Sequence, residues 1–138
     1  MPARLDEGEA MRIEWLDRTA IRTPYLTLCL TERQYLQVVK LLKVPRPVGW
    51  MPDECAACVQ TFNSPQGGIA CVVCLDESQH GSSLEIVESL VHEAVHVWQA
   101  CRDRMGETNV GKEIEAYAIQ NICATLFESY VKQTSCTA

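Results

Sequence analysis

A histidine–glutamate motif in the second half of the chain has the residue types and spacing of a metal site. Residues 92–96 read His-Glu-Ala-Val-His, the pattern H-E-x-x-H. On an α-helix, residues four apart lie on one face, about 6 Å apart along the axis, so His92 and His96 can reach a single ion. Glu93 is rotated by about 100° from His92, which places its carboxylate beside the ion rather than on it. The spacing predicts a zinc site.

The chemistry that these residues favour is hydrolysis. A zinc ion lowers the pKa of its water toward ~7, and a nearby carboxylate can take the proton as that water attacks a carbonyl. We therefore expect Glu93 to be the general base of a zinc-dependent hydrolase, with His92 and His96 as metal ligands.

A catalytic zinc site needs three protein ligands and one open position. The chain has only three histidines, and the third, His80, precedes the motif, so we expect a carboxylate from the helix that follows. The candidates are Glu107, Glu113 and Glu115. Glu107 falls in a turn exposed to solvent, and Glu113 falls in a first helical turn, where the helix dipole already stabilises an acid.

Glu115 is the favoured third ligand because of the residues that share its face. These residues are apolar: Ala118, Ile119, Ile122 and Leu126. A carboxylate on a buried apolar face is costly unless it is paired or bound to a cation. The alternative is a salt bridge, for instance with Arg102.

The motif and the helix after it resemble a known family. HEAVH at 92–96, followed by Glu115-Ala116-Tyr117-Ala118, is similar to the gluzincin branch of the zincin metallopeptidases, and most of all to small intracellular and phage-encoded members, including the ImmA/IrrE-like group. The resemblance covers residues 82–133. It implies that His92, His96 and Glu115 bind zinc, that Glu93 is the general base, and that an edge strand, here 69–76, holds an extended peptide or protein substrate.

A stabiliser of the developing oxyanion is usually needed opposite the metal. Tyr117, Tyr130 and His80 are the candidates, and each of them also fits a plain packing or solvent-facing role.

Eight cysteines are present, at positions 29, 55, 58, 71, 74, 101, 123 and 136. Cys55, Cys58, Cys71 and Cys74 have a spacing compatible with a second, structural Cys₄ zinc site. Residues 71–74 read as strand, however, so Cys71 and Cys74 should point to opposite faces. Buried free thiols are the favoured interpretation, and the structural zinc is the alternative.

The elements that position the motif follow from periodicity and capping residues. Ser82 with Glu85 predicts the start of a long helix that ends near Met105, with Gly106 just beyond it, and a last helix spans roughly 111–132. The helix that carries the motif has apolar residues on more than one side, including a stripe of Leu84, Val87, Val91, Val95 and Trp98. We therefore expect this helix to be buried.

The first half of the chain predicts a small sheet. Residues 25–30 read as a strand, residues 11–16 alternate weakly, and 58–63 with 69–76 read as a hairpin. Thr31 and Gln34 form a capping-box pattern for a helix that ends by Val44, before a loop over 45–54. The fold class is therefore α+β: a small antiparallel sheet with the motif helix and a second long helix, in a minimal zincin-like arrangement.

Length and composition limit the alternatives. A chain of 138 residues predicts one domain, with residues 1–10 disordered, 11–80 forming the sheet, helix and hairpin, and 82–133 the two long helices. A formal charge of −6 argues against nucleic-acid binding. No apolar stretch is long enough to cross a bilayer and no secretory signal is visible, so we expect a cytoplasmic protein without a membrane partner.

The function expected is therefore a narrow-specificity, regulatory zinc metallopeptidase acting on a peptide or protein. The alternative is a non-catalytic binding module stabilised by zinc, which could also carry a Cys₄ zinc-ribbon-like hairpin.

Overall fold

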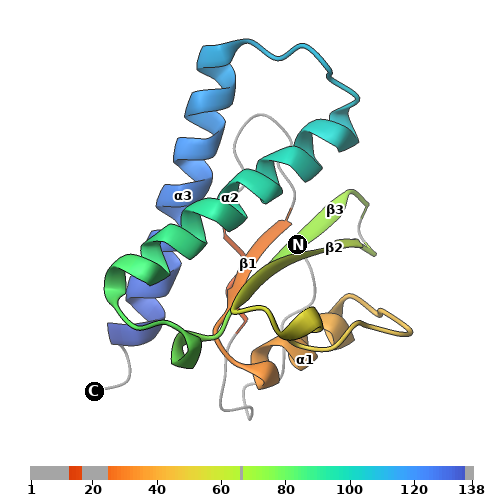
Figure 1. Ribbon diagram of the computed structural model, residues 1–138. Helices are drawn as coiled ribbons and strands as arrows, with labels where there is room; N and C mark the ends of the chain where they lie inside the picture. The colour runs from red at the N-terminus through yellow and green to blue at the C-terminus, as the bar shows by residue number, and fades with distance from the viewer. Residues whose placement is uncertain (1–12, 17–24, 66, 136–138) are drawn as a thin grey trace. The chain divides into compact units, whose positions relative to one another are not determined.

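The computed structural model describes residues 13–16, 25–65 and 67–135. The expected disorder of residues 1–10 therefore lies outside the described residues. The chain divides between Gln79 and His80 into two compact units. Along the chain, a three-stranded sheet with one helix is followed by two long helices, which confirms the α+β class (Figure 1). That the whole chain is one domain stays a prediction.

The first unit is a three-stranded mixed sheet in the order β1-β3-β2. The prediction that 69–76 is an edge strand is therefore wrong, because this strand is paired on both sides and has no free backbone edge for an extended substrate. Its strands are β1 (Tyr25–Cys29), β2 (Ala57–Asn63) and β3 (Ile69–Leu75). The predicted hairpin is confirmed, because β2 and β3 pair antiparallel, with Gly67 and Gly68 at positive φ in the connection. Residues 13–16 form no helix or strand, although the backbone N–H of Leu16 donates to the carbonyl of Leu26 on β1.

The prediction of an all-antiparallel sheet is wrong, because β1 pairs parallel to β3. A parallel pair needs a long crossover, usually helical, and residues 30–68 supply it. One signal for this pairing is present in the sequence. The run IACVVCL of β3 is apolar without alternation, as is typical of a strand buried on both faces, and Ala70 to Leu75 are all buried.

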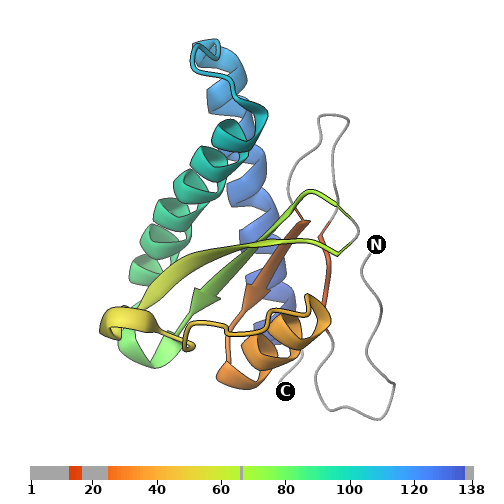
Figure 2. The ribbon, with the colours of Figure 1, turned by 90° about the vertical axis from the view of Figure 1, so that its right-hand side faces the viewer.

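The helix α1 (Glu32–Leu41) covers one face of this sheet (Figure 2). The predicted capping box is present: the Thr31 hydroxyl accepts from the Gln34 N–H, and the Gln34 side chain accepts from the Thr31 N–H. The core between helix and sheet consists of buried residues: Tyr25, Cys29, Tyr35, Val38, Val39, Leu42, Ala70, Val72 and Cys74. The segment expected as loop contains a short 3₁₀ turn at Pro52–Glu54, and a second one follows at Glu77–Gln79.

The second unit is a pair of long helices, α2 (Ser83–Met105) and α3 (Lys112–Ser135). They lie side by side and run in opposite directions (Figures 1 and 2). Both lie within a few residues of their predicted bounds. In the part of the chain that the structure describes, no helix is long and apolar enough to span a membrane.

The expected burial of α2 is only partly correct. Leu84, Val87 and Val91 are 65%, 42% and 40% exposed. Trp98 belongs to the same stripe but is buried, at 5% exposure. The other buried residues lie on another side of the helix: Ile86, Leu90, Glu93, Ala94, Val97 and Cys101. Within its own unit α2 has a single partner helix, which cannot cover it all round, so an apolar side chain on α2 does not by itself imply burial.

Candidate metal centre

Local signals fix the helix that carries the motif. The Ser82 side chain accepts a hydrogen bond from the Glu85 backbone N–H at 3.2 Å and so caps the first turn of α2. Gly106 ends the helix in the left-handed conformation, at φ 73°, which a glycine adopts without steric cost. His92 and His96 therefore lie in the middle of a helix with well-defined ends.

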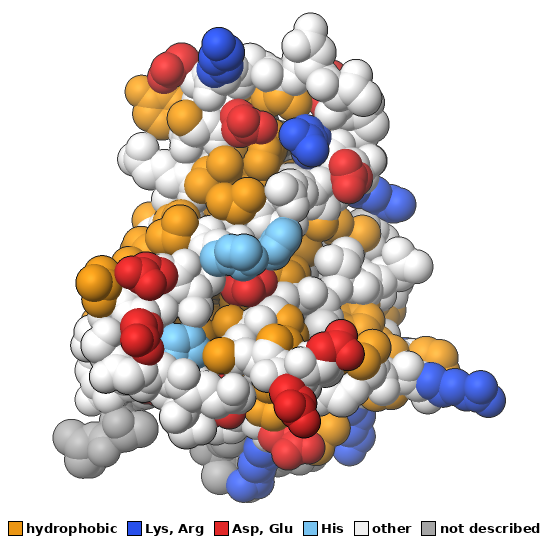
Figure 3. Space-filling model, in the orientation of Figure 1, with side chains coloured by type: hydrophobic (Ala, Val, Ile, Leu, Met, Phe, Trp, Pro, Cys, Tyr) orange, Lys and Arg blue, Asp and Glu red, His pale blue; other side chains and the backbone are white. Residues whose placement is uncertain are grey.

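The two imidazoles of the motif converge on one point. Nε2 of His92 and Nε2 of His96 are 3.1 Å apart, and both side chains are exposed. Two nitrogens bound at about 2.0–2.1 Å to a tetrahedral zinc ion lie roughly 3.3 Å apart, so the pair has nearly the spacing that zinc requires. The same distance also fits an N–H···N hydrogen bond between the rings in the absence of an ion. Histidine side chains are visible on the surface in Figure 3.

Gln99 contacts the other ring nitrogen of His96. Its Oε1 lies 2.8 Å from Nδ1 of His96, three residues earlier on the same helix. Because the ring bonds to Gln99 through Nδ1 and faces His92 through Nε2, both nitrogens of His96 have defined partners. Gln99 was not predicted from the sequence, although its i, i+3 spacing from His96 is a signal for this contact.

Glu93 lies beside the imidazoles but is buried, at 5% exposure. Burial raises the pKa of its carboxyl group, and the neighbouring rings of His92 and His96 act in the opposite direction. A carboxyl group with a raised pKa is a better proton acceptor than an ordinary surface glutamate. These surroundings are compatible with a general base, and that role of Glu93 stays a prediction.

Glu115 contacts a different part of α2. Its Oε2 accepts a hydrogen bond from Nε1 of Trp98 at 2.9 Å and lies 3.8 Å from a guanidinium nitrogen of Arg102. The salt bridge considered as the alternative is thus present. Trp98 and Arg102 lie roughly 200° and 240° around the helix from His96. The carboxylate is therefore on a side of α2 away from the imidazole pair.

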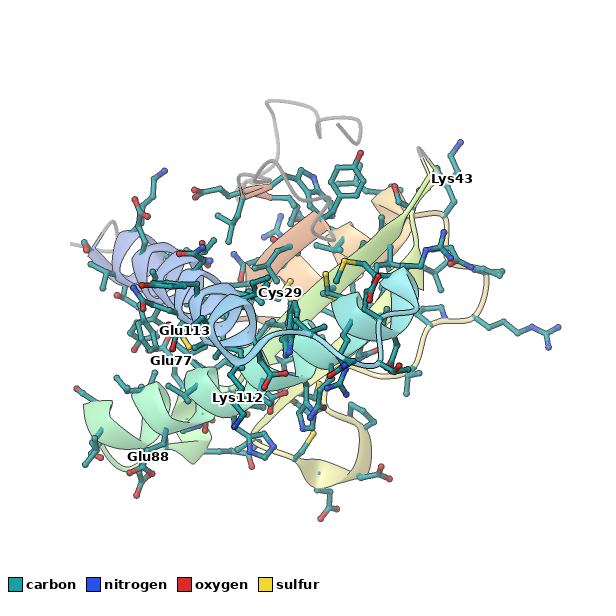
Figure 4. All side chains as sticks on the ribbon, turned by 90° about the horizontal axis from the view of Figure 1, so that it is seen from above. Cys29, Lys43, Glu77, Glu88, Lys112 and Glu113 are labelled. Atoms are coloured by element: carbon teal, nitrogen blue, oxygen red, sulfur yellow. The ribbon has the colours of Figure 1, made fainter. Side chains whose placement is uncertain are left out.

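The other predicted carboxylate ligands are not gathered at the imidazoles either. Glu107 is exposed, and Glu113, labelled in Figure 4, is exposed in the first turn of α3. Among residues 13–16, 25–65 and 67–135, no group of three or more His, Cys, Asp or Glu side chains is arranged to hold a metal ion. The structure brings two of the three predicted ligands together, and Glu115 as the third stays a prediction.

The candidates for oxyanion stabilisation are in different surroundings. Nε2 of His80 lies 2.8 Å from the hydroxyl of Ser89. Ser89 is one turn before His92 on the same side of α2, so His80 lies along the histidine face of the helix. Tyr117 is 60% exposed and Tyr130 is half-buried. The structure thus favours His80 over the two tyrosines as a residue near the candidate centre.

The cysteines of the first unit form a row that differs from the predicted Cys₄ set. Register places Cys74 opposite both Cys29 and Cys58, so these three residues share one face of the sheet. Cys71 is three residues from Cys74 and lies on the other face. Figure 4 labels Cys29 on β1. The sequence analysis missed Cys29 because strand pairing, not spacing along the chain, brings it to this row.

Contacts within the row stabilise the protonated thiols. The hydrogen bond with Cys74, followed by burial, raises the pKa of Cys58 well above its ordinary range. The hydrogen bond with Cys29 raises the pKa of Cys74 in the same direction. Metal ligation requires thiolates, so these contacts favour the interpretation as buried free thiols.

Comparison of the chain with protein-family models, curated proteins and solved structures finds no match.

Proposed function

We propose that this protein is a zinc-dependent metallopeptidase. The observation that supports the proposal most directly is the 3.1 Å approach of the His92 and His96 Nε2 atoms, with the buried Glu93 beside them. The donor set fits the metal, because neutral imidazoles are common zinc ligands and the spacing of the two nitrogens is close to tetrahedral.

The roles of the residues follow from their chemistry. A bound zinc ion would polarise the scissile carbonyl and lower the pKa of water. His92 and His96 would hold the ion, and Glu93 would accept a proton from the attacking water and pass it to the leaving nitrogen. The raised pKa of Glu93 suits both halves of that transfer, because the group must be a base first and an acid afterwards.

Glu115 completes the proposed ligand set, as the family resemblance implies. Its side chain is 41% exposed, which leaves it room to change conformation. To bind the ion, the carboxylate has to exchange the Trp98 indole and the Arg102 guanidinium for the metal. Ligation by Glu115 therefore predicts a rearrangement around Trp98 when zinc binds.

The proposed substrate is a peptide or protein, cleaved with narrow specificity in a regulatory role. This part of the proposal rests on the resemblance to small intracellular and phage-encoded metallopeptidases.

The decisive variant is Glu93→Gln, which keeps the size of the side chain and removes the base. We expect zinc content and folding to be unchanged and the hydrolysis of a peptide library to fall by at least about 100-fold, the usual contribution of a general base. The assay is mass-spectrometric detection of cleaved peptides with zinc-loaded protein. Glu88→Gln, on the same helix and exposed, is the matched control and should cleave like the wild type. Undiminished cleavage by Glu93→Gln would falsify the mechanism.

A non-catalytic, zinc-stabilised binding module is the second candidate. The engagement of Glu115 by Trp98 and Arg102 favours it, because a carboxylate with this partner set needs no metal. In that case zinc would bind to His92 and His96, chelation would lower stability, and neither the wild type nor Glu93→Gln would cleave any peptide.

A further inference from the structure

We propose that Gln99 is a positioning residue that fixes the tautomer and ring orientation of His96 for metal binding. The inference rests on the proposed function, since it presumes that His96 is a ligand. Gln99 itself does not touch the metal or the substrate in this role; it acts through the imidazole.

In the orientation that the structure gives the Gln99 amide, its oxygen faces Nδ1 of His96. An amide oxygen only accepts, so the 2.8 Å contact between Gln99 Oε1 and Nδ1 requires that Nδ1 be protonated. A neutral imidazole carries one proton, which leaves the lone pair on Nε2. Nε2 is the atom that faces His92 at 3.1 Å. With the amide reversed, Nδ1 would accept and Nε2 would carry the proton, which would close that atom to a metal.

The surroundings of the two residues explain why such a partner is needed. His96 is exposed, so its ring would otherwise rotate and exchange tautomers in water. Gln99 is half-buried and three residues further along the helix, so little further entropy is lost when its amide is ordered. Within the described part of the chain, His92 makes no corresponding contact through Nδ1 and bonds only to His96. His96 is thus the pre-organised member of the pair.

Hydrogen bonds behind metal-ligating histidines typically contribute 10–100-fold to metal affinity. Gln99→Met keeps the length and helix propensity of the side chain but has no strong acceptor. Gln99→Glu keeps the acceptor and strengthens it with a charge. Gln120→Met, on the exposed side of α3, is the matched control for the loss of a glutamine.

The measurement is the dissociation constant for Zn²⁺, by competition with a chromophoric chelator, on the full chain. We expect Gln99→Met to bind zinc about 10–100-fold more weakly than the wild type, while Gln99→Glu binds at least as tightly and Gln120→Met is unchanged. Circular dichroism of the metal-free proteins checks that each variant is folded.

The outcomes separate this inference from the proposed function. If the wild type binds no zinc, the proposed function fails, and this inference with it. If the wild type binds zinc and Gln99→Met binds it equally well, the role of Gln99 is overturned while the zinc site stands. Should Gln99→Met not fold, Gln99→Glu decides: affinity equal to or above that of the wild type supports the proposal, and weaker binding overturns it.

Discussion

Two glutamates near the motif illustrate how surroundings assign chemistry to identical side chains. Glu93 is buried, and the loss of hydration raises the pKa of its carboxyl group. Glu115 is partly exposed and accepts a hydrogen bond from Trp98 beside the Arg102 guanidinium. Burial at Glu93 suits its proposed role as a general base, whereas the Glu115 carboxylate would have to leave Trp98 and Arg102 to take up its proposed role as a ligand.

The approach of His92 to His96 could be predicted from sequence, and the position of Glu115 could not. Four residues of helix fix the relation of His92 to His96, so spacing alone is sufficient. The position of Glu115 depends on the turn after Gly106 and on how α3 lies against α2, neither of which has a short-range pattern. The contact between Gln99 and His96 could have been predicted from helical spacing as well, because the two residues are only three positions apart.

The cysteine row predicts how stability depends on pH. The pKa of Cys74 is raised in the folded state by its contact with Cys29, and that of Cys58 by its contact with Cys74. The unfolded thiols ionise near pH 8.5 while the folded ones stay protonated, so their stabilising contribution is complete below about pH 8.5 and is lost as the pH rises.

We therefore expect the free energy of unfolding to fall between about pH 8.5 and pH 10, by at most about 1.4 kcal/mol per pH unit for each fully buried thiol. Urea unfolding at several pH values measures it. Cys74→Ala should be less stable throughout but should show a shallower decline. A wild-type curve that is flat over this interval would contradict the contact-induced shifts.

At the scale of elements, the helices were predictable because their ends carry local signals. Thr31, Ser82 and Gly106 each act on backbone groups within a few residues. The direction of β1 was not predictable in the same way. The sequence of a single strand does not show whether its partner runs parallel or antiparallel. The sequence signal found here is the unbroken apolar run of β3, which is typical of a strand in a parallel pair.

Gly106→Ala tests the end of the motif helix. An added Cβ would meet no atom within 4 Å, so the whole cost comes from the φ of 73°. We expect a loss of about 1 kcal/mol in the free energy of unfolding, because only glycine adopts this conformation freely. Urea unfolding measures the loss.

Gly49→Ala is the matched control, since this glycine also has open space around its Cβ and is not at positive φ. It should change stability by less than about 0.5 kcal/mol. Zinc affinity should be unaffected in both variants, because neither changes a donor atom. Equal stabilities for Gly106→Ala and the wild type would mean that the αL conformation does not end the helix in solution.

At the scale of the whole molecule, each of the two units carries side chains of types that can bind a metal ion. The helical unit has His92, His96 and Glu115, and the sheet unit has the thiols of Cys29, Cys55, Cys58 and Cys74. Soft thiolates and mixed imidazole–carboxylate sets both bind zinc, so composition does not decide between them. The number of zinc ions per chain, and the variants that change this number, can show which of the two sets binds zinc.

The measurement is the zinc content of protein prepared without added metal, by plasma emission spectroscopy, for the wild type, Glu115→Ala, Glu113→Ala and Cys55→Ser. We expect about one zinc per chain in the wild type, in Cys55→Ser and in Glu113→Ala, which removes an exposed carboxylate from the same helix. Glu115→Ala should lose most of it, because two histidines alone bind zinc weakly compared with three ligands.

Each departure from this result identifies a different ligand set. If Glu115→Ala retains zinc, Glu115 is not a ligand and only contacts Trp98 and Arg102. The third ligand would then have to come from elsewhere in the chain. Two zinc ions, one of them lost in Cys55→Ser, would make the sheet unit a second zinc site despite its protonated thiols. Zinc lost only in Cys55→Ser would remove the metal from His92 and His96, and with it the peptidase proposal, because Glu93 would then have no activated water to deprotonate.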